Sequence, residues 1–359
     1  MGGGVWLTGF EPFGEHEGNV SQQVAEALDG FVGVIDLGES PGPYQAESRK
    51  SPVVVQSTIL TVDEEGAAAI ATCLPGGLIS ETERLANPAA IIHLGLAENA
   101  EWIRLEASAA NELAFRIADN SGRQVAGLAI DDDAPAQLNT TAPLDLILAE
   151  CADDERIRRS DDAGRFVCNE TYFRTLQVVE SAGMKDGYQR ALPVIFVHLP
   201  PTSVIPLDEQ VDVVRRIIAL VVQRPTMEVV GGLLRDKENR LLAARRAPDE
   251  YMAGYWEFPG GKVEKGESKS EALAREYFEE FGWRVKPLKI CEQYSHTWPE
   301  MTVRLTFLLC EAEGELPPAE MTSHDECRWL EEGELMGVEW LPPDVEFVRR
   351  IQQKGVTNL

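Results

Sequence analysis

The stretch GKVEKGESKSEALAREYFEEFGW, residues 261–283, decides the fold of the C-terminal part of this chain. Three of its carboxylates, Glu276, Glu279 and Glu280, lie at positions i, i+3 and i+4. On an α-helix these positions share one face, and three carboxylates there repel one another unless a cation lies between them. Because Mg²⁺ takes oxygen ligands and retains waters and substrate phosphates, the cluster predicts metal-dependent phosphate chemistry. The alternative is a Glu-rich face that is merely solvated.

The spacing of the surrounding residues argues against a merely solvated face. Five residues separate Gly261 from Glu267, and seven separate Glu267 from Arg275. This pattern resembles the signature of the Nudix hydrolases. It departs from that signature at Tyr277, where the family has an aliphatic residue, and it has the bulky Trp283 at the last apolar position.

The segment from about residue 228 to residue 352 resembles the mutator-type branch of the Nudix family, which cleaves nucleoside triphosphates to a monophosphate and pyrophosphate. The implied fold is an αβα sandwich with a mixed sheet. The resemblance implies Mg²⁺, or Mn²⁺, as the cofactor, and it implies that Arg275 pairs with Glu267 beside Gly261 to orient the carboxylates. Glu276 would also activate water. The implied metal ligands are the carbonyl of Gly260 and the side chains of Glu276, Glu279 and Glu280.

Substrate recognition is implied for three residues outside this stretch. Arg246 would hold phosphate, Phe258 would line the base pocket, and Asp344 would read the base. Asp344 stands where the guanine-sanitising type has Asn. An ionised Asp only accepts hydrogen bonds, which suits the exocyclic amine of cytosine, whereas a protonated Asp suits oxidised guanine. The substrate is therefore open between 8-oxo-dGTP and a (d)CTP-type nucleotide.

One metal ligand of the family is missing at its usual place. It lies in the loop before the strand at Trp329, where this chain has Ser323. Either Asp325 or Glu326 replaces that ligand, or the ligand is lost. The completeness of the metal site depends on this loop.

In the N-terminal half, three side chains form a candidate nucleophile, base and orienting carboxylate. Cys168 enters a predicted helix at residues 169–182, whose partial positive charge favours the thiolate. His198 follows a predicted buried strand at residues 193–197, and Glu106 follows the run WIRL. A histidine near a thiol serves as a base when a carboxylate orients it. Taken singly, a cysteine or a histidine is more often a structural residue.

From residue 5 to about residue 222 the chain resembles the pyroglutamyl peptidase I family, cysteine peptidases that remove an N-terminal pyroglutamate. The resemblance implies that Cys168 is the nucleophile, that His198 is the general base and then acid, and that Glu106 is its carboxylate partner. The matching pieces are TGFEPFG (8–14), IRLEASAAN (103–111), FRIADN (115–120), AGRFVCN (163–169) and FVHLP (196–200).

The substrate contacts of this half are also implied by the resemblance. Phe10 and Phe13 would flank the pyroglutamyl ring, and Arg116 matches an arginine that the family needs near its site. The chain departs from the family at Ala107, where arginine is usual, and it matches poorly over residues 36–57. The alternative is therefore a non-catalytic binding or dimerisation module, in which case only the Nudix half is active.

Length and charge indicate two domains and exclude some classes of partner. The chain has 359 residues, and Pro225, after a predicted helix at residues 207–222, separates a domain at 1–224 from one at 225–359. Its net charge of −27 repels nucleic acid polymers and anionic membranes. Because no run is apolar enough to span a membrane and the start lacks a targeting signal, we expect a cytoplasmic protein, with a homo-oligomer as an option. The six separated cysteines predict free thiols.

The apolar patterns predict an α/β protein whose N-terminal domain is a three-layer αβα structure. In that domain they indicate strands at 5–8, 53–62, 89–94 and 193–197, and helices at 21–28, 64–74, 169–182 and 207–222. In the C-terminal domain they indicate a strand pair at 228–234 and 240–245 around a turn at 236–239, strands at 303–310 and 327–330, and a helix at 342–352. Ser268 with Glu271 predicts a capping box, and Gly282 predicts the end of the intervening helix.

Overall fold

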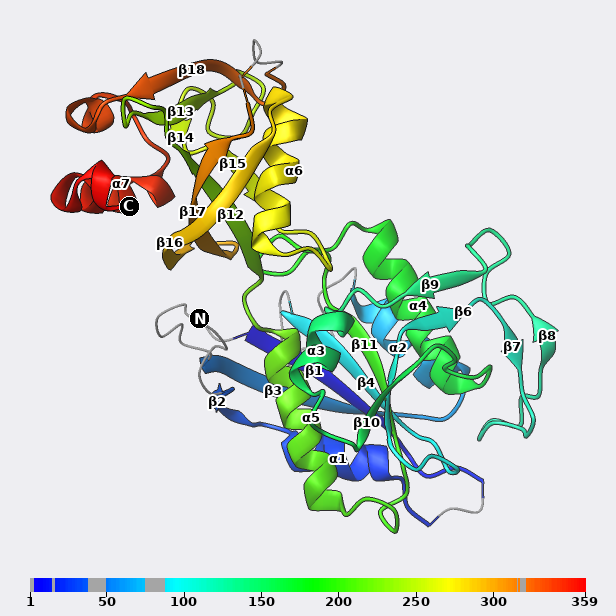
Figure 1. The fold of residues 1–359 in the computed structure, drawn as a ribbon. Coiled ribbons are helices and arrows are strands. Elements are labelled where there is room, and N and C mark those ends of the chain that lie inside the picture. Colours follow the sequence, from blue (N-terminus) through cyan, green and yellow to red (C-terminus); the bar gives the residue numbers. More distant parts are fainter. Residues whose placement is uncertain (1–2, 15–16, 38–49, 75–87, 315, 317–320) are drawn as a thin grey trace. The chain divides into compact units, whose positions relative to one another are not determined.

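The computed structural model describes residues 3–14, 17–37, 50–74, 88–314, 316 and 321–359 (Figure 1). Their contacts divide into two compact units, of which the first ends at Gln223 and the second begins at Arg224. Each unit has its own hydrophobic clusters. Within these ranges, no helix is long and apolar enough to cross a membrane. Part of the poorly matched region, residues 38–49, lies outside the described ranges.

The first unit contains a seven-stranded mixed sheet made of β1 (Gly3–Phe10), β2 (Val32–Asp36), β3 (Lys50–Leu60), β4 (Ala90–Leu96), β5 (Ile103–Glu106), β10 (Ile157–Ser160) and β11 (Val194–Leu199). The strand order is β10-β5-β11-β4-β1-β3-β2. The pairs β1/β3, β1/β4, β4/β11 and β5/β10 are parallel. The pairs β5/β11 and β2/β3 are antiparallel.

Helices cover both faces of this sheet (Figure 1). The buried side chains of α1 (Val20–Leu28), α3 (Leu144–Glu150) and α5 (Leu207–Val221) join one hydrophobic cluster with the sheet. Those of α2 (Glu64–Cys73) and α4 (Val167–Ser181) join a second cluster. Two helical layers around one sheet confirm the predicted three-layer αβα architecture.

The two clusters differ in composition. The buried members of the cluster shared by α1, α3 and α5 are Val, Leu, Ile and Ala side chains together with Cys151. The cluster shared by α2 and α4 is rich in aromatic side chains, which are Trp6, Phe10, Phe115, Tyr172, Phe173 and Phe196. The segment between β5 and α4 adds two small sheets, β6 (Ser108–Ala110) with β9 (Gln137–Asn139) and β7 (Leu113–Ala114) with β8 (Ala126–Leu128).

The second unit packs two sheets between two helices (Figure 1). One sheet has the order β15 (Gly260–Lys262), β12 (Thr226–Leu234), β17 (Thr302–Ala312) and β16 (Val285–Thr297). The other has the order β14 (Trp256–Glu257), β13 (Leu241–Arg246) and β18 (His324–Leu330). The helix α6 (Lys269–Phe281) joins one hydrophobic cluster and α7 (Pro342–Lys354) joins the other. Short 3₁₀ helices, η2 (Glu332–Gly337) and η3 (Val356–Asn358), complete the unit.

The predicted pairing of the strands on either side of the turn at residues 236–239 is wrong. Both strands form, as β12 and β13, but they belong to different sheets. The two edges of β12 are taken by β15 and by β17, which runs parallel to it. β13 therefore joins the other sheet, and within the described residues a bridge between Arg235 and Leu241 links the strand ends.

The helix that carries the carboxylate cluster has the predicted ends. The Ser268 hydroxyl accepts a hydrogen bond from the Glu271 amide at 3.2 Å, and the Glu271 carboxylate accepts one from the Ser268 amide at 2.7 Å. This reciprocal pair confirms the capping box. Gly282 ends the helix in the left-handed conformation, with φ 67°.

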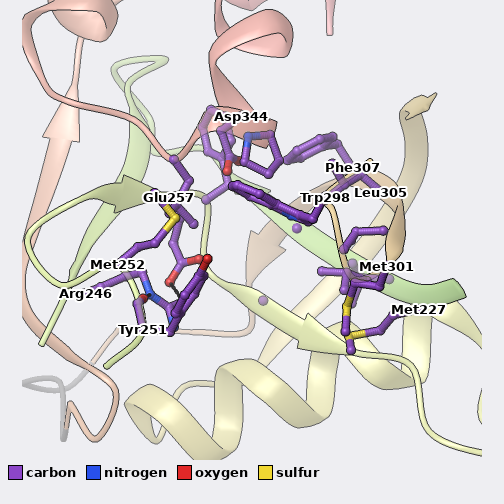
Figure 2. A pocket seen from close by; sticks show the side chains of 18 of the residues that line it. Met227, Arg246, Tyr251, Met252, Glu257, Trp298, Met301, Leu305, Phe307 and Asp344 are labelled. Carbon is purple, nitrogen blue, oxygen red and sulfur yellow. Dashed lines mark hydrogen bonds and ion pairs between the residues drawn. The ribbon is translucent and has the colours of Figure 1, made fainter. Parts of the chain in front are cut away.

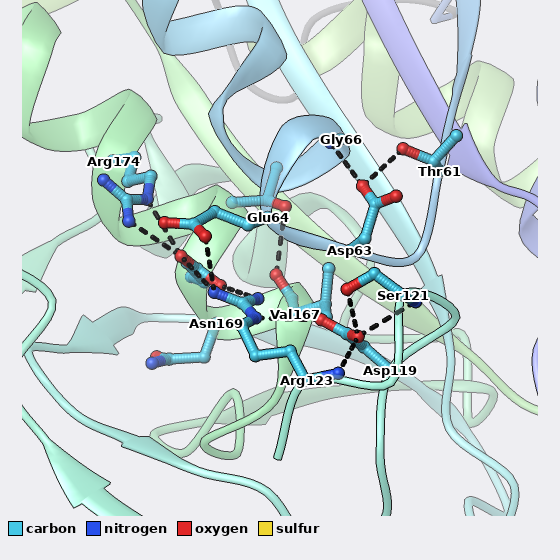
Figure 3. A network of polar contacts seen from close by, with 12 residues as sticks. Thr61, Asp63, Glu64, Gly66, Asp119, Ser121, Arg123, Val167, Asn169 and Arg174 are labelled. Carbon is cyan, nitrogen blue, oxygen red and sulfur yellow. Dashed lines mark hydrogen bonds and ion pairs between the residues drawn. The ribbon is translucent and has the colours of Figure 1, made fainter. Parts of the chain in front are cut away.

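A buried ion-pair network holds the N-terminal part of α4 in place (Figure 3). The Glu170 side chain is fully buried and lies 2.6 Å from Arg123 Nη2 and 2.8 Å from Arg174 Nη2. Arg123 Nε also pairs with Asp119 Oδ2 at 2.9 Å. The network therefore ties the loop around Arg123 to the helical turn that contains Cys168.

Arg123→Gln should destabilise the first unit, because it removes one of the two cations that compensate the buried Glu170 carboxylate. Loss of one partner of a buried pair costs about 3 kcal/mol. Arg159→Gln is the matched control, since Arg159 pairs with Asp161 at a largely exposed site and its loss should cost less than about 1 kcal/mol. Calorimetric unfolding of the full chain measures both changes. Equal shifts in the two variants would contradict the structural role of the network.

Candidate active sites

The thiol site of the first unit is assembled from a helix start and two neighbouring strands. Cys168 lies in the first turn of α4, which begins at Val167 rather than at the predicted residue 169. His198 lies in β11 opposite Gly95 of β4. A Cβ atom at Gly95 would lie 3.0 Å from Cys168 Sγ and 2.8 Å from the Phe196 ring. Glycine at this position therefore allows the thiol to approach the sheet.

Glu106 orients the imidazole of His198. Its Oε1 lies 2.8 Å from His198 Nδ1, and the carboxylate is fully buried. The Tyr172 hydroxyl donates a hydrogen bond to the main-chain carbonyl of Glu106 at 3.0 Å, which fixes the end of β5. The imidazole also forms a hydrogen bond with Cys168. The three predicted residues thus lie together in the order carboxylate, imidazole and thiol.

The surroundings of His198 favour its charged form. Burial lowers the pKa of His198, but the hydrogen bonds and charges of Cys168 and Glu106 outweigh burial and raise the pKa to about 9. The imidazole is therefore protonated at neutral pH. Because its pKa is raised in the folded protein, protonated His198 contributes to the free energy of unfolding. This contribution is complete below the pKa of an unperturbed histidine and is lost as the pH rises through about 9.

A cavity of about 130 Å³ lies beside this triad. Phe10, at the end of β1, and Phe13, in the following turn, line it together with Cys168 and His198. Arg116 is exposed and does not line this cavity, so its role stays a prediction. The sequence did not identify the other lining residues, which are Asn19, Val62, Leu96, Ala163, Phe166 and Val167.

Among these, Asn19 had a sequence signal. It is the N-cap of α1, where its Oδ1 accepts a hydrogen bond from the Ser21 amide at 3.0 Å. Its Nδ2 donates to the Glu11 carbonyl at 3.1 Å, which holds the turn that carries Phe13. An Asn directly before an apolar helical pattern is an N-cap signal. The apolar lining residues come from separate segments, so no local pattern indicates them.

In the second unit, α6 places the three clustered carboxylates on one face. Arg275 Nη1 lies 2.9 Å from Glu276 Oε1 and 3.0 Å from Glu279 Oε2. The same guanidinium forms two hydrogen bonds with Glu267, at 2.7 and 3.1 Å. Arg275 therefore supplies the positive charge beside Glu276 and Glu279 in this structure.

Glycines bring one of these carboxylates against the backbone of the sheet. A Cβ atom at Gly261 would lie 2.2 Å from the carboxyl carbon of Glu276, so any side chain there would displace that carboxylate. At Gly260 a Cβ atom would lie 2.0 Å from the Val230 carbonyl oxygen. Both positions in β15 require glycine because neighbouring atoms leave no room for a side chain. Burial raises the pKa of the Glu276 carboxyl above its usual range.

Of the three clustered carboxylates of α6, Glu280 is the most buried. Burial raises the pKa of its carboxyl to about 7, and Oε2 has no hydrogen-bond partner among the described residues.

The loop carboxylates proposed as substitutes for Ser323 are engaged elsewhere. Asp325 pairs with Arg245 at 2.7 Å, and Glu326 pairs with the same Arg245 at 3.0 Å.

Within the described ranges, no group of three or more His, Cys, Asp or Glu side chains is arranged around one point as metal ligands. The donor set on α6 is nevertheless composed of carboxylate oxygens, which is the chemistry that Mg²⁺ and Mn²⁺ select. The buried Glu280 Oε2 lacks a partner that a cation would supply. These residues fit a divalent ion in their chemistry, and Arg275 provides the cationic partner of the other two carboxylates.

A pocket of about 550 Å³ lies beside β12, β15 and β17 (Figure 2). The predicted residues Arg246, Phe258, Gly260 and Asp344 all line it. Figure 2 shows Arg246, Tyr251 and Met252 on one side of this pocket and Met227 and Met301 on the opposite side. The sequence did not single out the lining residues Met227, Tyr251, Met252, Glu257, Trp298 and Met301.

The polar residues of this pocket have strong local partners. The side chain of Asp344 is enclosed, and burial, followed by the charge of Glu257, raises its pKa well above the usual range. Arg246 donates hydrogen bonds to Glu257 at 2.7 Å, to Glu250 at 3.2 Å and to the Tyr251 carbonyl at 2.7 Å. Arg246 therefore fixes the loop that carries Tyr251, and its contact with phosphate stays a prediction.

Comparisons with known proteins match both units. Residues 4–212 match the family model described as pyroglutamyl peptidase, and residues 225–351 match the NUDIX domain model. The pyrrolidone-carboxylate peptidase of Deinococcus radiodurans is 32% identical over 207 residues, which are 57% of this chain and 82% of that protein. The 8-oxo-dGTP diphosphatase of Escherichia coli is 37% identical over 90 residues, which are 25% of this chain and 70% of that protein.

Among solved structures, the pyrrolidone carboxyl peptidase from Thermus thermophilus matches with 28% sequence identity and a TM-score of 0.45. The match covers 60% of this chain and 99% of that chain. By the two family models and the sequence relatives, the chain belongs to the pyroglutamyl peptidase family over residues 4–212 and to the Nudix family over residues 225–351, and it joins two hydrolase domains in one polypeptide.

Proposed function

We propose that this chain is a bifunctional hydrolase. Its Nudix unit converts 8-oxo-dGTP to the monophosphate and pyrophosphate in the presence of Mg²⁺, and its peptidase unit removes N-terminal pyroglutamate from peptides. The observation that carries the first activity is the enclosed Asp344 in a pocket of about 550 Å³ next to the glycines that border the α6 carboxylates. The observation that carries the second is the chain of contacts from Glu106 through His198 to Cys168.

The state of Asp344 favours an oxidised guanine over cytosine. Burial raises the pKa of this side chain and so favours its protonated form, which offers both a donor and an acceptor. Oxidised guanine presents both donors and acceptors, whereas the cytosine amine needs only an acceptor. The names of two relatives, the 8-oxo-dGTP diphosphatases of Escherichia coli and Proteus vulgaris, agree with this choice.

In the nucleotide reaction, residues of α6 would hold the cation and one of them would activate water. A divalent ion supplies charge neutralisation for the phosphate oxygens. Glu276, Glu279, Glu280 and the Gly260 carbonyl would hold it. Glu276, which lies against Gly261 and has a raised pKa, accepts a proton from the attacking water. Arg275 keeps the carboxylates of Glu276 and Glu279 in position through the contacts described above.

The purified full chain should release pyrophosphate from 8-oxo-dGTP faster than from dCTP when Mg²⁺ is present. Glu279→Gln should lower this rate by roughly a hundredfold or more, because it removes a metal ligand without changing side-chain volume. Glu313→Gln, at an exposed turn after β17, should leave the rate unchanged. Pyrophosphate release measures the rate and thermal unfolding checks the fold. Full turnover in Glu279→Gln, or no release from any nucleotide, would overturn the assignment.

The affinity for 8-oxo-dGTP should fall as the pH rises through the raised pKa of Asp344. A raised pKa means that Asp344 is protonated below that pKa and loses its donor above it. Asp344→Asn keeps a donor and an acceptor but does not titrate, so its KM should change less across the same pH range. The comparison is the KM of each protein between pH 6 and pH 9. Parallel pH profiles would show that ionisation of Asp344 does not control binding.

In the peptidase reaction, the Cys168 thiolate attacks the pyroglutamyl carbonyl and His198 protonates the leaving amine. Water then releases pyroglutamate, with His198 acting as base. Phe10 and Phe13 flank the ring in the cavity of about 130 Å³. All six cysteines are free thiols, which supports a reducing, cytoplasmic location.

A chromogenic pyroglutamyl amide should be cleaved under reducing conditions, and Cys168→Ala should abolish cleavage. Cys168 should also react with iodoacetamide at pH 7 faster than the other cysteines, and His198→Gln should slow that reaction about tenfold because it removes the adjacent cation. Cys327→Ala is the control, since Cys327 is remote in sequence and its pKa is raised by burial. Equal alkylation of all thiols without cleavage would instead identify a non-catalytic binding or dimerisation module.

A further inference from the structure

Two buried polar atoms of the Nudix unit face each other, and neither has a hydrogen-bond partner in the part of the chain that the structure describes. They are Glu280 Oε2 on α6 and His324 Nδ1 at the start of β18, and they lie 3.8 Å apart. The side chain of His324 is 1% exposed and that of Glu280 is 13% exposed. A separation of 3.8 Å is too long for a direct hydrogen bond. Because buried polar atoms are rarely left unpaired, this pair indicates a missing ligand between them.

The other nitrogen of His324 fixes which atom is available. His324 Nε2 lies 2.9 Å from Glu257 Oε1, so this nitrogen carries the proton and donates it to the carboxylate. The lone pair of Nδ1 is then directed at Glu280. The Phe281 ring stacks on the imidazole at 5.3 Å with an interplanar angle of 17°, which holds its plane. A histidine with one nitrogen bound to a carboxylate and the other nitrogen free has the arrangement typical of metal ligands.

The distance between the two atoms suits a shared ion. Two ligands with metal bonds of roughly 2.1 Å are separated by roughly 3.0 to 4.2 Å, depending on the angle at the metal. The observed 3.8 Å lies in this range. The neighbouring Asp325 and Glu326 are paired with Arg245 and are not available for this position. His324 therefore faces Glu280 of α6, beside Ser323, whose side chain forms a hydrogen bond with the same carboxylate.

We propose that His324 Nδ1 and Glu280 Oε2 together bind a divalent transition-metal ion, with Mn²⁺ preferred over Mg²⁺. The inference rests on the proposed function in one respect, because Glu280 belongs to the carboxylates that hold the cation there. Mg²⁺ favours an all-oxygen shell, whereas imidazole favours transition metals. Water and phosphate oxygens complete the coordination. The His324 nitrogen takes the place of the metal ligand of the family that is missing here, where the chain has Ser323.

The test is pulsed electron paramagnetic resonance of Mn²⁺ bound to the full chain. Modulation of the electron spin echo by a ¹⁴N nucleus reports a coordinated imidazole directly, without any turnover. The wild-type protein should show this coupling, and His324→Gln should lose it. His296→Gln is the matched control, because His296 lies in β16 of the same unit but contacts Trp298 rather than Glu280, and it should retain the coupling.

Titration of the same proteins measures the metal preference. His324→Gln should weaken Mn²⁺ binding by about tenfold or more, a loss comparable to that caused by disturbing the partners of metal ligands, and should leave Mg²⁺ binding nearly unchanged. Glu280→Gln, which preserves side-chain volume, should reduce the ¹⁴N coupling as a second variant if His324→Gln fails to fold. Absence of ¹⁴N coupling in the wild-type protein, or its persistence in His324→Gln, overturns the proposal.

The outcomes for this site and for the proposed reaction are separable. Pyrophosphate release with Mn²⁺ but without ¹⁴N coupling would reject the histidine ligand and leave the nucleotide activity standing. The coupling without pyrophosphate release from any nucleotide would support the metal site and reject the proposed reaction.

Discussion

A carboxylate removed from water must be paired, protonated or bound to a cation, and both units of this protein are organised by that requirement. In the first unit, Glu170 is paired with Arg123, and Glu106 is paired with His198. In the second unit, burial raises the pKa of Asp344, which favours its neutral form. The chain has 60 acidic residues and 33 Lys and Arg residues, so its buried acids compete for few cations. At Glu280 Oε2, which has no hydrogen-bond partner among the described residues, the proposed cation would meet this requirement.

Both sites also place a reactive side chain against the backbone of a glycine. Gly95 accommodates the Cys168 thiol over β4, and Gly261 accommodates the Glu276 carboxylate over β15. In each case a helix supplies the reactive group and a strand supplies the surface that it touches. The precision of these contacts comes from regular elements, because helices and strands hold positions more rigidly than loops do. A side chain at Gly261 would first meet the Glu276 carboxylate, whereas one at Gly95 would meet the Phe196 ring as well as the Cys168 thiol.

The sequence predicted best the features that depend on local spacing. The triad, the α6 carboxylates and the capping box follow from short motifs or helical periodicity, and the layer order follows from alternating strands and helices. Features that depend on tertiary contacts were not predictable in this way. The partners of β12 and β13 are chosen by competing strands far along the chain, and the lining residues Val62 and Leu96 come from separate segments. His324 was overlooked because its role depends on Glu257 and Glu280, which are remote in sequence.

The unequal composition of the two hydrophobic clusters of the first unit has a consequence for how this domain can change. On the α1, α3 and α5 side, residues of similar volume can replace one another at small cost, because apart from Cys151 the buried members of this cluster are aliphatic. On the α2 and α4 side, Tyr172 bonds the Glu106 carbonyl and Phe196 lies 4.6 Å from the His198 ring. Repacking there would move the triad itself. The layer of α1, α3 and α5 can therefore accept substitutions, including ones designed for stability. Substitutions in the layer of α2 and α4 are restricted by its contacts with the triad.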